Sequence, residues 1–327
     1  SCWGRTVSQF AVSRFVRLYP AYWFAVILTT VVVTALAGGL EPVSRIGLLA
    51  NATMLSTSFG YPYVDPVYWT LSVELHFYVI FAFVAWRGLT YWKVVGFCTA
   101  WGALGGAFLL LHVGPGVVHE FVDPEYCWYF IGGVAFFLIH KFGPRWPSIL
   151  LVLGSLAVAL PTIYDIGSQN VPELGFTYPM WPVPALVIAF YAAMALVASR
   201  RLDNLRWRWF GVAGAATYPL YLIHEYVGWE IIGRLQDRLD HGLLVLILVV
   251  VMVVAAWVLH EFVENPIATL LRRVLTPVVT RVFGGPSGRH RPGRTVPAHD
   301  RPTVVLPKVA AEVVGSAPEQ ESVASRV

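Results

Sequence analysis

Titratable side chains lie inside two long apolar stretches of the sequence. Glu74 falls in DPVYWTLSVELHFYVIF (residues 65–81), and His224 falls in TYPLYLIHEYVGWE (residues 217–230). An acid at the centre of a membrane span costs about 3 kcal/mol on insertion scales, so such residues usually face a partner or a watery cavity. Helical rise places both residues at similar depth, where a carboxylate and an imidazole could form an orienting or proton-transferring pair. We predict both as catalytic; the alternative is hydrogen bonding for packing alone.

The neighbours of these two residues at helical spacing are polar. Thr70 and Tyr78 lie four residues on either side of Glu74, and Tyr221 lies on the helix face of His224. Hydroxyls and aromatic rings around a buried acid would form a dry cavity in which dipoles act strongly. The predicted cavity lining comprises Trp69, Thr70, Tyr78, Tyr218 and Tyr221.

Two arginines precede the first long apolar run, in VSRFVRLYPAYW (residues 12–23). Arg14 and Arg17 are three residues apart, so they share one face if the helix begins early. Guanidinium groups bind phosphate through paired hydrogen bonds, which would suit a phosphate-bearing ligand. The alternative is that they only flank the cytoplasmic end of a membrane span, as basic residues commonly do.

Metal chemistry is not indicated by the sequence. His260 and Glu264 are four residues apart in HEFVENP (residues 260–266), but no third ligand is in view, so helix capping and interface anchoring explain them better. Cys2, Cys98 and Cys127 show no CxxC or histidine-linked spacing, so neither a zinc site nor a disulfide framework is predicted. We expect no bound metal or cofactor.

The elements that must position these residues are membrane helices. Of the 327 residues, 57% are hydrophobic and only 13% are charged, about half the charged fraction of a soluble domain. The net charge of +4 would suggest nucleic acid in a soluble protein, but in a membrane protein it indicates topology, and we expect no nucleic-acid partner. The sequence therefore predicts an all-α, polytopic transmembrane helix bundle.

Eight apolar segments are long enough, or nearly so, to cross a bilayer core of about 30 Å. They lie near residues 19–37, 67–86, 94–113, 126–140, 148–164, 181–198, 212–232 and 242–262. With eight spans, one side of the membrane receives only Arg45, Arg234 and Arg238, and the other side receives the remaining lysines and arginines. The positive-inside rule then places both termini in the cytoplasm.

The last part of the chain differs in composition. Residues 272–327 are rich in Pro, Gly, Arg and Ser and show no apolar period, so we predict a disordered, basic cytoplasmic tail after a membrane domain at residues 1–271.

Four motifs occur together in an informative order. SRFVRLYPAYW, VYWTLSVELHFY, TYPLYLIH and HEFVENP resemble, in order and spacing, motifs of the acyltransferase-3 family of membrane-bound O-acyltransferases. The similarity runs from about residue 10 to residue 271, and the WTLSVE stretch is its strongest part. It implies an integral enzyme of the bacterial cytoplasmic membrane that moves an acyl group, often acetyl, from acyl-CoA to a hydroxyl of a cell-envelope glycan. It also implies that Arg14 and Arg17 match the family's R-x-x-R motif for the acyl donor, and that Glu74 matches its S-V-E motif.

The chain departs from the family pattern at its start. Family members usually begin with two further spans, the first of which carries an arginine and a histidine thought to activate the acceptor. This sequence opens with SCWGRTVSQF, so we expect a truncated member with two in-frame spans upstream. Two other functions stay open: a proton-coupled transporter, which would also need a buried Glu and His, and a non-catalytic membrane scaffold.

Overall fold

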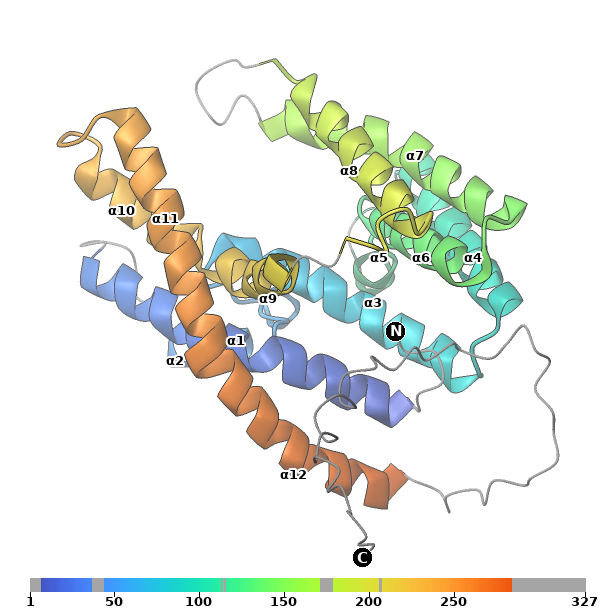
Figure 1. Ribbon diagram of the computed structural model, residues 1–327, viewed down its shortest axis with the longest axis horizontal. Helices are drawn as coiled ribbons and strands as arrows, with labels where there is room; N and C mark the ends of the chain where they lie inside the picture. Colours follow the sequence, from blue (N-terminus) through green and yellow to red (C-terminus); the bar gives the residue numbers. More distant parts are fainter. Residues whose placement is uncertain are drawn as a thin grey trace, which may run out of the picture. The chain divides into compact units, whose positions relative to one another are not determined.

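The computed structural model describes residues 7–36, 44–112, 114, 116–170, 179–205 and 208–283 (Figure 1). Every regular element among these residues is a helix, which confirms the predicted all-α bundle. Five helical stretches are long and apolar enough to cross a membrane, and two further apolar helices, Pro182–Ala198 and Phe210–Ile223, are shorter. The long stretches are Val7–Ala35, Pro66–Trp86, Tyr91–Leu110, Trp146–Ser168 and His241–Val279.

Seven of the eight predicted apolar segments each fall mainly on one helix, and the seventh, residues 212–232, is divided between two. A π-helical segment, His260–Glu264, joins the last two helices, and 3₁₀ turns lie at Thr57–Phe59 and Pro66–Tyr68. The α-helices are α1 Val7–Leu36, α2 Arg45–Asn51, α3 Trp69–Trp86, α4 Tyr91–Leu110, α5 Val117–Val122, α6 Cys127–Phe142, α7 Trp146–Asn170, α8 Pro182–Ala198, α9 Arg208–Ile223, α10 Tyr226–Leu235, α11 His241–Leu259 and α12 Asn265–Phe283.

The predicted seventh span, residues 212–232, is not one helix. α9 ends at Ile223, His224 and Glu225 form a bend, and α10 begins at Tyr226. The amide of Tyr226 donates a hydrogen bond to the buried carboxylate of Asp65 across 3.3 Å, so a residue distant in the sequence caps the new helix. Hydropathy predicts one continuous span because it does not register such a cap.

α1 begins well before its apolar run. Its 30 residues correspond to about 45 Å at 1.5 Å per residue, which exceeds the hydrocarbon core of about 30 Å. Pro20, expected within the first turns, therefore lies in the helix interior, where it is buried. The additional N-terminal turns carry both Arg14 and Arg17.

α12 extends the helical part of the chain beyond the predicted membrane domain. The predicted boundary between residues 271 and 272 falls inside α12, which continues to Phe283 and packs along α1 (Figure 1). Arg272 and Arg273 are exposed while the opposite face contacts α1, so amphipathic packing keeps this stretch helical. Residues 284–327 lie outside the described residues, and the predicted tail stays a prediction for them.

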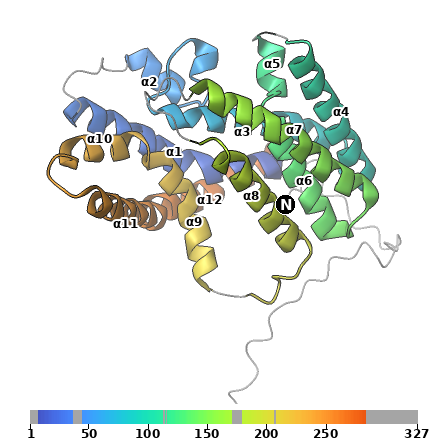
Figure 2. The same ribbon diagram turned by 90° about the horizontal axis from the view of Figure 1, so that it is seen from above.

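Two apolar clusters organise the helices. The first includes the fully buried rings of Tyr22 and Tyr68 and joins α1, the segment before α3, α9 and α11. The second includes Trp101 and Ile131 and joins α4, α6 and α7. α3 contacts α1 on one side and α4 and α5 on the other, so it lies between the helices of the first cluster and those of the second (Figure 2). Residues of α3 can therefore contact helices of both clusters.

Candidate active site

A chain of hydrogen bonds joins Arg14 of α1 to Glu74 of α3. Tyr78 donates its hydroxyl proton to Glu74 Oε1, and Arg14 Nη1 donates to Tyr78 Oη across 3.3 Å. Glu74 and Tyr78 meet because residues four apart share a helix face. The Arg14 guanidinium also lies over the rings of Tyr78 and Phe10, 5.4 and 5.6 Å from their centroids. We call these three residues the Arg14–Tyr78–Glu74 cluster; two helices bring a predicted acid and a predicted arginine together.

Two cavities adjoin Arg14 and Tyr78 of the Arg14–Tyr78–Glu74 cluster, and Glu74 itself lines neither of them. One, of about 360 Å³, lies among α1, α3, α4 and α6, and the other, of about 440 Å³, lies among α1, α3 and α12. Phe10, Arg14 and Tyr78 line both cavities, and the other walls are mostly apolar or aromatic. The first is completed by Phe77, Phe81, Val94, Tyr129, Phe130, Gly133, Val134 and Phe137, and the second by Ala11, Val12, Phe15, Leu18, Tyr19, Leu75, Val79, Ala82 and Leu275.

Arg14 retains an unused donor in this apolar setting. Its Nε is buried and has no hydrogen-bond partner in the part of the chain that the structure describes. A buried donor without a partner costs about 1–3 kcal/mol, and more for a charged group. An oxygen of a phosphate, a carboxylate or an acyl carbonyl bound at this point would recover that cost.

Arg17 is placed differently from Arg14. The early start of α1 meets the condition under which the two arginines were expected to share a face, but Arg17 is exposed whereas Arg14 reaches Tyr78. The structure therefore does not place both guanidiniums in the cluster. A donor-binding role for Arg17 stays a prediction.

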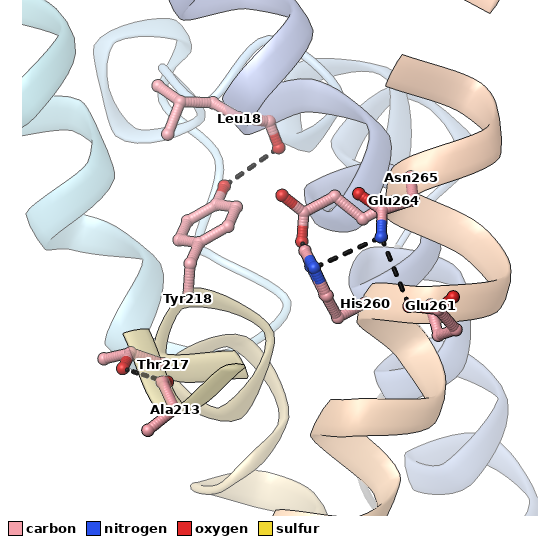
Figure 3. Close-up of polar contacts among 8 residues, drawn as sticks. All are labelled: Leu18, Ala213, Thr217, Tyr218, His260, Glu261, Glu264 and Asn265. Atoms are coloured by element: carbon pink, nitrogen blue, oxygen red, sulfur yellow. Dashed lines mark hydrogen bonds and ion pairs between the residues drawn. The ribbon is translucent and has the colours of Figure 1, made fainter. Parts of the chain in front are cut away.

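The other predicted cavity residues divide into two sets. Tyr221 donates its hydroxyl to the backbone oxygen of Val67 at 2.8 Å and contacts the hydroxyl of Thr70, one turn before Glu74. Tyr218 donates to the backbone oxygen of Leu18 at 2.9 Å and so ties α9 to α1 (Figure 3). These contacts place two tyrosines of α9 at the helix pair that carries the cluster. Trp69 instead packs on the ring of Tyr126, with centroids 4.7 Å apart. Of the five predicted lining residues only Tyr78 lines the two cavities, and Trp69, Thr70, Tyr218 and Tyr221 line neither.

His224 is not paired with Glu74 among the described residues. Its side chain is exposed at the bend between α9 and α10, and its Nδ1 lies 2.8 Å from the backbone oxygen of Tyr221. The predicted pairing assumed that the depth of His224 in the membrane can be counted along one straight helix, but α9 ends at Ile223. The bend turns the residues after Ile223 away from the path that the count assumed.

Asp65 is a buried acid that the sequence analysis did not single out. It is fully buried, and its two oxygens accept hydrogen bonds from the amides of Val67 and Tyr226, at 3.2 and 3.3 Å. The Asp-Pro pair directly before the α3 region is a helix-start signal, so the contact with Val67 could have been predicted. The contact with Tyr226 could not, because it joins residues 161 positions apart.

His260 and Glu264 form a hydrogen-bonded pair within the π-helical segment. His260 Nδ1 lies 2.9 Å from Glu264 Oε2, and the side chains are only 17% and 14% exposed (Figure 3). Asn265 Nδ2 lies 3.2 Å from His260 Nε2, so that nitrogen accepts while Nδ1 carries the proton shared with Glu264. The sequence predicts helix capping and interface anchoring for these residues, but the pair lies inside continuous helix, where π-helical turns often accompany functional sites.

Known proteins with sequences similar to this chain are acyltransferases. A family model described as an acyltransferase domain matches residues 4–261. The chain is also similar to the acyltransferase MdmB of Streptomyces mycarofaciens, with 26% identity over 311 residues that cover 84% of this chain and 78% of that protein. No solved structure matches. The family match covers the helices that carry Arg14, Tyr78 and Glu74, and the chain therefore belongs to the acyltransferase-3 family of membrane acyltransferases.

Proposed function

We propose that this protein transfers an acyl group, acetyl in the first instance, from acyl-CoA to a hydroxyl of a cell-envelope glycan. The observation that carries the proposal is the Arg14–Tyr78–Glu74 cluster beside two apolar cavities. An arginine with a free donor suits an anionic or carbonyl oxygen, and a carboxylate nearby suits the hydroxyl that attacks it.

The proposed reaction assigns a role to each member of the cluster. The acceptor oxygen forms a bond to the thioester carbonyl carbon, the carbon–sulfur bond breaks, and the proton of the acceptor hydroxyl ends on the departing thiolate. Glu74 binds the acceptor hydroxyl and takes its proton during attack, and Tyr78 fixes the carboxylate by donating to Oε1. Arg14 donates the unused hydrogen bond of its Nε to a phosphate of acyl-CoA or to the oxyanion that develops on the thioester carbonyl.

The same proposal places the protein in the bacterial cytoplasmic membrane with both termini inside the cell. The basic residues sort to one side when the eight apolar segments alternate, which supports this orientation. Arg14 then lies near the cytoplasmic face, where acyl-CoA is available. Arg17, exposed one turn later, could contact the same donor outside the cavities.

A proton-coupled transporter is the second candidate, because one observation favours it. The helix interrupted at His224 and Glu225 is the kind of discontinuous helix that lines transport sites in many carriers. The family match and the named relative both favour acyl transfer.

A labelling experiment separates the two candidates. Membranes from cells that express the whole reading frame are incubated with acetyl-CoA labelled in the acetyl group. Acyl transfer predicts loss of the thioester and label in envelope glycan, both absent from membranes without the protein. A transporter predicts neither, and instead predicts proton movement that depends on a solute. Unchanged thioester and unlabelled glycan would reject the proposed function.

A further inference from the structure

The segment that leads into α3 is joined to the α9–α10 bend along a row of hydrogen bonds. Tyr221 donates to the backbone oxygen of Val67 at 2.8 Å, and Tyr68 donates to the backbone oxygen of Leu222 at 3.3 Å. The hydroxyls of Tyr221 and Thr70 also meet. The row therefore sets the position of α9 against the face of α3 that continues, one turn later, to Glu74.

Asp65 lies at the end of this row and connects both segments. Oδ1 accepts from the amide of Val67 at 3.2 Å, and Oδ2 accepts from the amide of Tyr226, the first residue of α10, at 3.3 Å. Glu225 precedes α10 but makes no side-chain cap hydrogen bond. Asp65 thus caps α10 from a remote position in the chain.

The amides of Val67 and Tyr226 explain why a carboxylate occupies this buried position, because each donates a hydrogen bond to one of its oxygens. Asp65 is fully buried, and burying a charge is unfavourable unless several hydrogen bonds compensate it. Only an ionised carboxylate offers one good acceptor oxygen to each amide, because the amide side chain of Asn has a single acceptor oxygen.

We propose that Asp65 is a positioning residue of the acyl-transfer site. It fixes the α9–α10 bend against the start of α3 and so holds Tyr221 and Thr70 next to the helix turn that carries Glu74. The proposal rests on the proposed function for its catalytic consequence. The connection that Asp65 makes between the α9–α10 bend and the start of α3, which we call the Asp65 tether, is independent of that function and can be measured separately.

The ionisation of Asp65 supports a pH-dependent test. Asp65 precedes the membrane-spanning stretch Pro66–Trp86, and burial raises its pKa to about 6, an effect that the amides of Val67 and Tyr226 oppose. The titratable groups that face it are Tyr68, Tyr221, His224, Glu225 and Tyr226. Among these, the charge of Glu225 raises the pKa further and that of His224 lowers it. As pH falls through about 6, Asp65 becomes protonated, and the oxygen that carries the proton is a poor acceptor for its amide hydrogen bond. Turnover is therefore expected to fall.

The test compares Asp65→Asn and Asp65→Ala with Asp240→Asn in the full-length protein in membranes. Asp240 is a matched control because one of its oxygens caps α11 locally, at the amides of Gly242 and Leu243, without joining two elements. Turnover and the KM for acetyl-CoA are measured from pH 5 to pH 8. Hydrogen exchange of the first amides of α10 is followed in the same purified proteins. His224→Gln is added because histidine in general also titrates in this range.

If Asp65 positions the site, Asp65→Asn lowers turnover per folded molecule about tenfold to hundredfold, because small displacements of catalytic groups have effects of this size. The KM for acetyl-CoA stays within about twofold. The loss of turnover below pH 6 should disappear in Asp65→Asn and persist in His224→Gln. Exchange at α10 should speed up in both Asp65 variants and not in Asp240→Asn.

Two results would overturn the inference. Unchanged exchange at α10 in Asp65→Ala would show that Asp65 does not tether the bend, whatever the protein catalyses. Faster exchange with normal turnover and a normal pH profile would show a structural tether without a catalytic role. Absence of acyl transfer in the unmodified protein would instead reject the proposed function, and the exchange result would still decide the tether.

Discussion

Arg14 combines a fixed position with an unused donor. One edge of its guanidinium donates to Tyr78, two aromatic rings lie beside it, and its Nε is buried without a partner in the described part of the chain. A guanidinium can keep one hydrogen bond and offer another N–H in a fixed direction, whereas an ammonium acts as a point charge. The geometry at this residue therefore depends on arginine and not only on positive charge.

Arg14→Lys is expected to raise the KM for acetyl-CoA about tenfold or more, because a hydrogen bond to a charged group contributes about 1.5–3 kcal/mol. Arg45→Lys is the control, an exposed arginine at the start of α2 that lines neither cavity, and it should leave the KM unchanged. Steady-state kinetics on equal amounts of folded protein provide the measurement. An unchanged KM in Arg14→Lys, or equal effects in both variants, would contradict the placement of Arg14 at the donor.

At the scale of elements, contacts between residues close in the sequence could be predicted, and contacts between distant residues could not. The contact of Glu74 with Tyr78 and the pairing of His260 with Glu264 follow from spacing along a helix, and both were visible in the sequence. The hydrogen bond between Tyr226 at the bend and Asp65 joins residues 161 positions apart, and the contact of Arg14 with Tyr78 requires that α1 packs on α3. Neither packing relation has a signature in hydropathy or spacing.

Close packing of α6 gives a prediction at the same scale. A Cβ added at Gly132 would lie 2.6 Å from the hydroxyl of Tyr191 and 3.0 Å from Ser155 Oγ, two groups that are themselves hydrogen-bonded. A Cβ at Gly133 would meet nothing within 4 Å. Gly132→Ala should therefore destabilise the protein by about 1–3 kcal/mol, as overpacking does. Gly133→Ala should be neutral or slightly stabilising, because alanine favours helix.

Thermal unfolding of both variants in the same detergent checks this prediction. A higher midpoint for Gly133→Ala than for Gly132→Ala is expected. Equal midpoints would mean that α6, α7 and α8 do not pack as closely as the structure has them.

For the whole molecule, the basic residues and the apolar segments lead to one proposed orientation. Arg200 and Arg201 follow α8 on the side assigned to the cytoplasm, while Arg45 begins α2 on the opposite side. Composition was enough to predict a polytopic all-α bundle. It could not predict that residues 7–18 and 272–283 are already helical, because these turns belong to α1 and α12, which pack against each other.

Labelling of single cysteines tests the orientation. Leu49 and Arg201 are both exposed, and the native Cys98 and Cys127 are buried. With Cys2 replaced by serine, a membrane-impermeant maleimide added to intact cells should label Leu49→Cys. It should label Arg201→Cys only after permeabilisation. The reverse pattern, or labelling of both in intact cells, would contradict the proposed topology.

The most direct test of the acyl-transfer account is the transfer rate of Glu74→Gln. Glutamine keeps the shape of the side chain and can still bond Tyr78, but it carries no charge and cannot take the acceptor proton. An acid–base role for Glu74 predicts that the transfer rate falls about a hundredfold or more, in the usual range for such groups. Insertion and expression should be unchanged, and Glu120→Gln, an exposed acid outside the cluster, should be fully active. Near-normal transfer by well-folded Glu74→Gln would contradict the assignment of the reaction to the Arg14–Tyr78–Glu74 cluster.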